Sequence, residues 1–556
     1  LVGSEMCIRD SVSDGQLREL SALKNGLQIS DRELKKGKTQ VPAYRAMYLD
    51  SQLKGGDLIK VEKDNAFRAL IRNMQTMEEH KFQIPREQEK ILRGYQKEGF
   101  YWIKTLKHNQ FGGILADDMG LGKTLQVITF LWSEFQESAP GENRRALVIT
   151  PASLVFNWMN EIERFAPGLP ATVVTGDVKE RKALIKNAGE REVLITSYDL
   201  LKRDLKAYQN LDFAVQIIDE AQYIKNHGTQ VAKAVKEIRS EFRLALTGTP
   251  VENRLSELWS IFDFLMPGFL YSYEKFRKEI ELPAVQYSNS DAMERLQKMI
   301  RPFVLRRLKR DVLKDLPDKL EKDMFSPLES EQKELYEAHT ERLRLMLGMQ
   351  SDAEFRTSKL QILAEITRLR QICCYPGLVY EGYKGNSSKL EMCMELVQNA
   401  VNGGHKLLLF SQFTTMLDVL AVRLKKAKVS FYMLTGSTSK EKRAQMVHAF
   451  NEDDTSVFCI SLKAGGTGLN LTAADIVIHY DPWWNLAVQN QATDRAHRIG
   501  QQNVVSVYRL FMKDTIEERI RALQERKREL ADEILSGEGI GQALISREEV
   551  LELLGR

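Results

Sequence analysis

From Gly112 onward, short apolar runs alternate with segments that have the spacing of amphipathic helices. The first group of runs is GILAD, ALVIT, TVVTG, EVLITS, AVQIID and RLALTG, and helix-patterned stretches such as PASLVFNWMNEIERF lie between them. Buried strands that alternate with helices are typical of a parallel, doubly wound sheet with both faces covered. The pattern resumes with KLLLFSQF, FYMLTG, SVFCISLK, DIVIHYD and VVSVYRL. The sequence therefore predicts an α/β fold with two parallel-sheet lobes.

Between the two groups of strands, from about Leu270 to Ser387, the strand rhythm disappears. Stretches such as SEQKELYEAHTERLRLMLGM are charged and helical in pattern, so we expect helical insertions and a linker there. Near the C-terminus, Thr515 and Glu518 have the spacing of a capping box. An apolar stripe follows at Ile516, Ile520, Leu523 and Leu530. This pattern predicts a helix that packs across the lobes.

The chain has 556 residues, which is too many for one core, and two to four domains are expected. Its first residues, LVGSEMCIRDS, resemble a translated sequencing adapter, and we expect the remainder to be the C-terminal part of a longer protein. The predicted division begins with residues 1–84, which comprise a non-native leader at 1–11 and the remnant of an N-terminal accessory domain. It continues with a first lobe at 85–270, helical insertions and a linker at 271–387, a second lobe at 388–514, and a C-terminal helical brace and tail at 515–556.

The composition excludes few partners. Lys and Arg number 80 against 76 Asp and Glu, and the resulting net charge of +4 neither demands nor excludes nucleic acid. No apolar run reaches the length of a membrane span, so no membrane partner is expected. The cysteines show no metal-ligand spacing, which favours reduced thiols in the cytoplasm over a zinc site. They are Cys7, Cys373, Cys374, Cys393 and Cys459.

A phosphate loop is indicated by ILADDMGLGKTLQVITFL, in which GLGKT lies between a strand and a helix. The glycines let backbone N–H groups face phosphate oxygens, Lys123 neutralises their charge, and Thr124 offers a hydroxyl to Mg²⁺. The strict pattern has glycine at position 117, where this chain has Asp117. By itself the match could therefore be a chance sequence in a loop.

A second motif strengthens the assignment. VQIIDEAQ is an apolar strand that ends in Asp219 and Glu220. A carboxylate at a strand end beside a phosphate loop suits Mg²⁺, which favours Asp219, and Glu220 can orient or deprotonate the attacking water. The next strand ends in Thr247 and Thr249 of the sequence TGTP, which we interpret as a relay between the nucleotide and another ligand.

Two arginines, Arg495 and Arg498, stand three residues apart in QNQATDRAHRIGQQ. Arginines stabilise charge on a transferring phosphoryl group. The spacing predicts that both lie on one face of a helix, where they would reach the γ-phosphate when the second lobe closes on the first. The alternative is that they hold the second lobe together through carboxylates such as Asp494.

In this order, the motifs resemble the SWI/SNF family of ATPases in helicase superfamily two, and the resemblance covers about Ile91 to Leu523. The closest similarity is to the bacterial branch, in which an accessory domain precedes the motor. The motifs that carry it are LRGYQKEGFYWI, DDMGLGKT, LVITPASLVFNW, IIDEAQYIKN, LALTGTP, LRQICCYP, KLLLFSQFT, SLKAGGTGLNLTAADIVIHYDPWWN and QATDRAHRIGQ.

The resemblance implies two RecA-like lobes and an ATP-dependent motor that tracks along double-stranded DNA, usually without separating its strands. It implies ATP and Mg²⁺ as cofactors, with Thr124 and Asp219 at the metal. It also implies that Gln96 recognises adenine. The implied ATP contacts are Gly120, Leu121, Gly122, Lys123, Thr124, Asp219, Glu220, Gly466, Gly468, Arg495 and Arg498. The implied DNA contacts are Thr150, Ser153, Thr467 and Trp484.

The chain departs from the family pattern in places. Gln222 replaces the histidine of the usual DEAH sequence, but it can still hydrogen-bond to the TGTP loop. CCYP stands where an asparagine and a histidine are usual. RPFVLRRLKRD is read equally well as a DNA-facing patch or a solvated helix face. The basic residues of that segment are Arg301, Arg306, Arg307, Lys309 and Arg310.

Several functions share these residues. A DNA translocase is the first hypothesis, and a strand-separating helicase would use the same ATP site. A third is a remodelling partner of RNA polymerase or another complex, for which DNA is only the track. An inactive ATPase is the least favoured, because every catalytic position is filled. We expect a monomer that works in the bacterial cytoplasm at the nucleoid.

Overall fold

The structure is a computed structural model. It describes residues 32, 42–53, 63–76, 82–138, 141–248, 255–286, 290–313, 317–348, 352–465, 469–483, 486–522 and 524–525. The chain divides into two compact units. The first is formed mainly by residues up to Asp117 and by Gly122–Arg307, and the second mainly by Leu308–Ala531.

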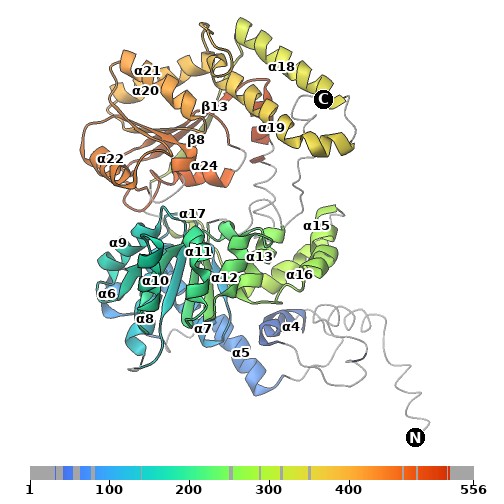
Figure 1. The fold of residues 1–556 in the computed structure, drawn as a ribbon, viewed down its shortest axis with the longest axis vertical. Coiled ribbons are helices and arrows are strands. Elements are labelled where there is room, and N and C mark those ends of the chain that lie inside the picture. Colours follow the sequence, from blue (N-terminus) through green and yellow to red (C-terminus); the bar gives the residue numbers. More distant parts are fainter. Residues whose placement is uncertain are drawn as a thin grey trace, which may run out of the picture. The chain divides into compact units, whose positions relative to one another are not determined.

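The first unit is built on a parallel sheet with the strand order β3-β4-β2-β5-β6-β1-β7. Its strands are β1 (Gly113–Leu115), β2 (Ala146–Thr150), β3 (Ala171–Val173), β4 (Val193–Ser197), β5 (Phe213–Asp219), β6 (Ser240–Leu246) and β7 (Val304–Leu305). Strands β2 and β4 are buried at every position, and β5 at every position before Asp219. This burial explains their continuous apolar runs, because helices cover the sheet (Figure 1).

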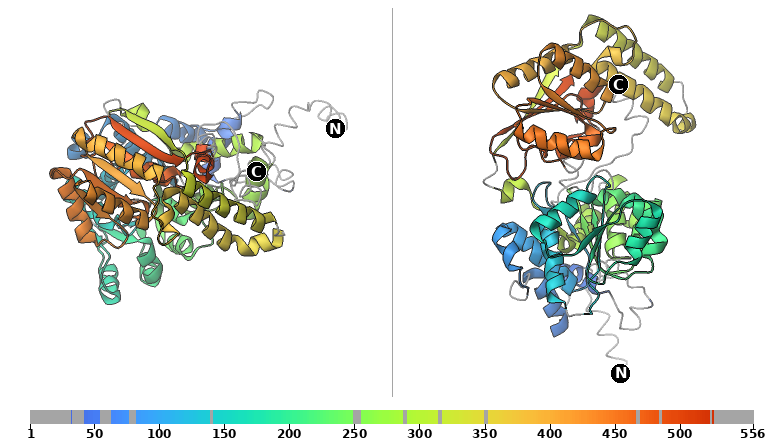
Figure 2. Two further views of the ribbon diagram at one scale, coloured as in Figure 1. Left: turned by 90° about the horizontal axis from the view of Figure 1, so that it is seen from above. Right: turned by 60° about the vertical axis from the view of Figure 1, so that its left-hand side comes forward.

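The second unit has a parallel sheet of its own, with the order β10-β11-β9-β12-β13-β8. Alternate residues of β9 enter different cores: Leu407 and Leu409 pack in one cluster, Leu408 and Phe410 in another. Helices therefore lie on both faces of this sheet (Figure 2). The strands are β8 (Lys319–Ser326), β9 (Leu407–Ser411), β10 (Phe431–Leu434), β11 (Val457–Ser461), β12 (Ile476–His479) and β13 (Val505–Met512).

The predicted fold class, two parallel-sheet lobes with helices, is confirmed. The helices of the first unit are α4 (Ala46–Leu53), α5 (Asn65–Thr76), α6 (Arg86–Ile91), α7 (Gly94–His108), α8 (Lys123–Glu137), α9 (Val155–Phe165), α10 (Val178–Lys186), α11 (Tyr198–Tyr208), α12 (Gln230–Glu237), α13 (Leu255–Leu265), α14 (Tyr273–Phe276), α15 (Leu282–Gln286) and α16 (Ser290–Ile300). Those of the second unit are α17 (Lys309–Val312), α18 (Ser330–Gly348), α19 (Asp352–Cys374), α20 (Ser388–Asn402), α21 (Thr414–Lys426), α22 (Lys440–Glu452), α23 (Leu462–Gly465) and α24 (Leu486–Thr493).

The segment expected to lack strands contains two, β7 and β8, and the expectation was wrong there. Strand β8 pairs with β13 along its whole length. Its sequence KLEKDMFS is charged because it lies at the edge of the sheet, where half of its residues are exposed and only Ser326 is buried. Arg509 of β13 reaches across to Asp323 at 2.7 Å. A strand stabilised by such cross-strand ion pairs lacks the apolar signal that marks the other strands.

Helices α18 and α19 pack together in the second unit, as the helical pattern predicts. Their cluster includes Tyr336, Leu343 and Ile366, together with Ile516 and Ile520 of the helix that begins at 516. The described part of the C-terminal helix thus packs inside the second unit. The prediction that it spans the lobes stays a prediction, since Leu523 and Leu530 lie outside the described residues.

The start of that helix is capped much as its sequence suggests. The hydroxyl of Thr515 accepts a hydrogen bond from the Glu517 backbone N–H, and the Glu518 carboxylate accepts one from the Asp514 backbone N–H. Glu517 also forms a fully buried ion pair with Lys389 of α20 at 2.7 Å. The helix is therefore anchored to the core of the second unit at its first turn.

Candidate nucleotide site

The phosphate loop leaves β1 and ends at α8, as predicted. Gly120 and Gly122 have φ angles of 82° and 74°, in the left-handed region that favours glycine. The Nζ of Lys123 donates to the backbone oxygen of Asp117 at 2.6 Å, across the loop. Thr124 is half-buried in the first turn of α8. The backbone N–H groups at the start of α8 supply the partial positive charge that binds anions.

Gln96 lies against this loop. It is 2 % exposed in the first turn of α7, and its side-chain oxygen accepts a hydrogen bond from the Arg93 backbone N–H. A Cβ added at Gly122 would meet the Gln96 Nε2 at 2.5 Å. The GYQ segment, although distant in sequence, therefore lies beside the glycine turn.

Asp219 ends β5 and is fixed by three donors. Its Oδ2 accepts hydrogen bonds from Trp158 Nε1 at 2.8 Å and Thr150 Oγ1 at 3.3 Å, and its Oδ1 accepts one from the Glu220 backbone N–H. Burial raises the pKa of the Asp219 carboxyl, while the Trp158 bond and the nearby charge of Lys123 oppose that rise. A divalent cation would relieve the burial cost of this carboxylate, so its surroundings suit Mg²⁺.

Glu220, Gln222 and Thr247 form a hydrogen-bonded chain. The Gln222 Nε2 donates to Glu220 Oε2 at 2.8 Å, and the Thr247 hydroxyl donates to Gln222 Oε1 at 3.2 Å. Glu220 has a positive φ of 53°, a conformation uncommon for residues other than glycine and often found at functional sites. The amide of Gln222 thus bridges the acidic motif to the end of β6, the contact expected of the usual histidine. Thr249 lies outside the described residues.

Two residues that support this site were not among the predicted site residues. Trp158 lies in α9, and its ring N–H donates to Asp219. Tyr198 is buried, donates its hydroxyl to the Asp219 backbone oxygen at 2.7 Å, and stacks on Tyr223. Burial raises the pKa of Tyr198 well above its usual value, so this hydroxyl stays a donor.

The predicted nucleic-acid contacts fall into different surroundings. The predicted contact at Thr150 stays a prediction: in this structure the Thr150 side chain is fully buried, and its hydroxyl donates to Asp219. Ser153 is exposed. Thr467 and Trp484 lie outside the described residues, as do the predicted ATP contacts Gly466 and Gly468.

The two arginines do not share a helix face, which corrects the sequence interpretation. Helix α24 ends at Thr493, and the chain continues in turns. The backbone oxygen of Arg495 accepts a hydrogen bond from Leu471, which diverts it from helical pairing. Arg495 is 5 % exposed, whereas Arg498 is half-buried and donates to the Leu469 backbone oxygen at 3.5 Å.

Asp494 is engaged by Lys309 in the structure. The Lys309 Nζ donates to Asp494 Oδ1 at 2.6 Å and to the His497 backbone oxygen at 2.7 Å, and burial lowers the pKa of this lysine. Lys309 therefore braces the segment that carries Arg495 and Arg498. The segment RPFVLRRLKRD was predicted to be either a DNA-facing patch or a solvated helix face. Neither prediction fits Lys309, because its charged group points inward within the second unit.

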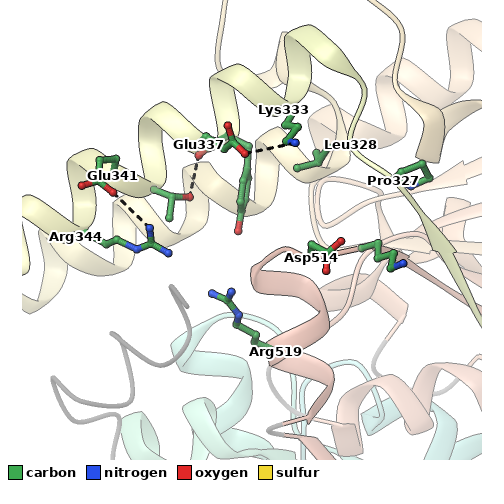
Figure 3. Close-up of a pocket in the computed structure, with 11 residues that line it drawn as sticks. Pro327, Leu328, Lys333, Glu337, Glu341, Arg344, Asp514 and Arg519 are labelled. Atoms are coloured by element: carbon green, nitrogen blue, oxygen red, sulfur yellow. Dashed lines mark hydrogen bonds and ion pairs between the residues drawn. The ribbon is translucent and has the colours of Figure 1, made fainter. Parts of the chain in front are cut away.

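The second unit also has a cavity of about 570 Å³ beside α18 and the start of the C-terminal helix (Figure 3). Its charged side chains have both signs, and several pair with each other, as Lys333 does with Glu337 and Arg344 with Glu341. Such a lining has no preference for an anionic ligand, and the cavity contains none of the predicted nucleotide-binding residues.

Among the described residues no His, Cys, Asp or Glu cluster of three or more could hold a metal by itself. The described helices include none with the length and apolarity to cross a membrane. The fold and the loop define a nucleotide-binding protein with two parallel-sheet units. A model of the SNF2-related domain matches residues 95–378, just over half of the chain, and the chain belongs to this family.

Two further family models match other parts of the chain. The helicase conserved C-terminal domain matches residues 388–500, and the bacterial SNF2 helicase associated domain matches residues 11–85. The match at 11–85 confirms the predicted similarity to the bacterial branch with an upstream accessory domain.

Curated relatives share this sequence over most of the chain. A Mycoplasma pneumoniae protein named as an ATP-dependent helicase is 40% identical, with 87% of this chain and 46% of the relative covered. A Bacillus subtilis protein named as an ATP-dependent helicase/translocase is 40% identical over 86% of this chain and 53% of its own length. The chain thus spans about half the length of these relatives. A solved Sulfolobus solfataricus SWI2/SNF2 ATPase core with double-stranded DNA is 38% identical, with 80% of this chain and 93% of that chain covered and a TM-score of 0.41.

Proposed function

We propose that this protein hydrolyses ATP to move along double-stranded DNA. The observation that carries the proposal is the chain of hydrogen bonds from Glu220 through Gln222 to Thr247. This chain joins Glu220, whose carboxylate is suited to activating water, to Thr247 at the end of β6. A change at the nucleotide would therefore reach the loop that contains TGTP. Membership of the SNF2-related family and the name of the Bacillus subtilis relative support the same function.

Residues of the phosphate loop, the GYQ segment and the acidic motif each have a part in hydrolysis. Lys123 leaves the Asp117 carbonyl to bind the phosphates, while Gly120, Leu121 and Gly122 turn the backbone toward them. Gln96 recognises adenine. Glu220 orients and deprotonates the attacking water, and its neighbour Gln222 holds the carboxylate in place.

Thr124 and Asp219 would hold Mg²⁺. The buried, hydrogen-bonded carboxylate of Asp219 fits a cation, because a positive charge beside it would offset the desolvation that raises its pKa. When bound, the cation neutralises charge on the phosphate oxygens. Because Asp219 must be deprotonated to bind it, metal affinity should weaken as the pH falls toward the raised pKa of this carboxyl.

The second unit would supply Gly466, Gly468, Arg495 and Arg498 when the units close on the nucleotide. Hydrolysis would then depend on closure, which couples it to motion along DNA. Coupling would use Gln222, Thr247 and Thr249, and DNA contacts would include Ser153, Thr467 and Trp484. We further propose that the protein acts as a monomer in the cytoplasm at the nucleoid, where its DNA track lies.

Strand separation is the second candidate, because the Mycoplasma pneumoniae relative is named as a helicase. It uses the same ATP residues and differs only in what happens to the duplex. Remodelling of a protein complex on DNA, such as one with RNA polymerase, would add a partner to the same motor. These candidates differ in the nucleic acid that stimulates hydrolysis and in the products of the reaction.

The ATPase rate without nucleic acid and with single strands, duplex DNA or RNA tests the proposal. We expect duplex DNA to stimulate hydrolysis most, and to bind with an affinity that falls with salt and varies little between unrelated sequences. The expected salt response comes from contacts with the phosphate backbone. A flat salt response, a strong preference for one sequence, or stimulation by RNA alone would contradict it.

A further inference from the structure

Asp117, at the position where the strict phosphate-loop pattern has glycine, is completely buried in an ion pair with Arg307. The guanidinium donates to both carboxylate oxygens, through Nε at 2.9 Å and Nη2 at 2.5 Å. Such a two-pronged pair is the strongest geometry available to these groups. The Gln126 Nε2 of α8 adds a hydrogen bond to Asp117 Oδ2 at 3.2 Å. The buried charge at this unusual position is therefore fully compensated.

Strand β7 explains how Arg307 reaches Asp117. Residues Leu115 of β1 and Leu305 of β7 are partners in the parallel register. Since the two strands run in the same direction, the residues two positions further along, Asp117 and Arg307, leave the sheet side by side. The strand that the sequence did not reveal is thus the element that places this arginine at the entry of the phosphate loop.

Arg307 also contacts the side of the site that carries Gln96. It donates to the backbone oxygen of Tyr95, and its guanidinium lies 5.2 Å from the Tyr95 ring centre. Its Nη2 donates to Gln126 Oε1 at 2.9 Å. One side chain therefore ties together the start of the phosphate loop, helix α7 next to Gln96, and helix α8.

Gly99 in the middle of α7 makes room for this arrangement. A Cβ at Gly99 would lie 1.8 Å from Gln126 Oε1 and 2.9 Å from Arg307 Nη2. Glycine costs roughly 0.5–1 kcal/mol in a helix interior relative to alanine. A glycine here is explained by the close approach of the two polar side chains, which supports the view that the cluster is a built feature of the site.

We propose that Arg307 is a positioning residue that sets the spacing between the phosphate-binding loop and the base-recognising Gln96. The proposal rests on the proposed ATP-binding function. Arg307 does not touch the nucleotide in this account: it acts through Asp117 and the Tyr95 backbone. Loss of its guanidinium should weaken nucleotide binding and also reduce the preference for adenine over guanine, because both sides of the site lose their common anchor.

The test is equilibrium binding of ADP and GDP to the full chain and to its Arg307→Gln variant, with melting temperatures measured on the same samples. We expect about tenfold weaker ADP binding and a smaller ADP-to-GDP affinity ratio, since small misplacements of binding groups have effects of this order. Arg307→Lys keeps the positive charge but cannot donate to both Asp117 oxygens as the guanidinium does. It should therefore give intermediate values of the ADP affinity and of the ADP-to-GDP ratio. Arg203→Gln removes an exposed arginine from α11 of the same unit and should behave as wild type.

A double variant controls for the effect of misfolding on nucleotide binding. Arg307→Gln leaves the buried Asp117 carboxylate without its cation, whereas the pair Arg307→Gln with Asp117→Asn removes both charges. The double variant should fold and still show the reduced affinity ratio. Unchanged ADP binding, an unchanged ADP-to-GDP ratio, or a loss of binding that only follows unfolding in both variants would overturn the proposal. A wild-type protein that binds no ADP would instead overturn the proposed function itself.

Discussion

A Glu220→Gln protein should bind ATP but hydrolyse it about 10²- to 10⁴-fold more slowly than wild type, the range lost when a general base is removed. The substitution keeps the size of the side chain. Its amide oxygen can still accept the Gln222 hydrogen bond that Glu220 Oε2 accepts now. Binding and folding should therefore survive, while the group that takes the proton from water is gone.

Single-turnover hydrolysis and ATP binding on saturating duplex DNA measure the two properties separately. Asp199→Asn is a matched control, because it neutralises an exposed carboxylate on α11 of the same unit. A companion variant, Lys123→Ala, should lose nucleotide affinity or turnover, since it removes the cation from the phosphate loop. Turnover at the wild-type rate in either Glu220→Gln or Lys123→Ala would contradict the assignment of this site.

Arg498→Ala should reduce turnover by about 10³-fold or more, the effect typical of an arginine that stabilises a transferring phosphoryl group. ATP affinity should change much less, because the charge on the γ-phosphate is stabilised more in the transition state than in the ground state. The alternative is that both arginines hold the second lobe together by pairing with carboxylates such as Asp494. In the structure Lys309 already engages Asp494, and Arg498 donates to the Leu469 backbone oxygen.

Thermal melting paired with single-turnover hydrolysis separates the two accounts. Arg498→Ala should melt close to wild type, since this side chain is only half-buried. Arg495→Ala should also lower turnover, but Arg495 is 5 % exposed and its loss will carry a folding cost as well. Arg498 is thus the cleaner probe. A stable Arg498→Ala protein that hydrolyses ATP at the normal rate would rule out its catalytic role.

The parts of the fold that could be predicted from the sequence are those in which the pattern of apolar residues directly reflects burial. Strands such as β2 and β9 are apolar at nearly every position because helices cover both sheet faces. Strand β8 was not predicted because its stability comes from ion pairs at the sheet edge. Strand β7 was not predicted because it has only two residues. Periodicity cannot detect strands of these kinds.

The candidate site was predictable where single motifs supply the chemistry, as in the phosphate loop and at Asp219 and Glu220. It was not predictable where packing decides the role of a side chain. Thr150 was predicted to contact DNA, but its hydroxyl donates to Asp219, and the ring N–H of Trp158, which was given no role, donates to the same carboxylate. The three-residue spacing of Arg495 and Arg498 predicted a helix face that the early end of α24 removes.

The central claim is that hydrolysis drives movement along intact duplex DNA, and displacement of a triplex-forming strand tests it most directly. A third strand is bound at one end of a long duplex, and its release is followed on addition of ATP. We expect wild-type protein to release it only with ATP and without separating the duplex, and Glu220→Gln to release none. Rapid ATP hydrolysis on the same duplex with no release of the third strand would contradict the account.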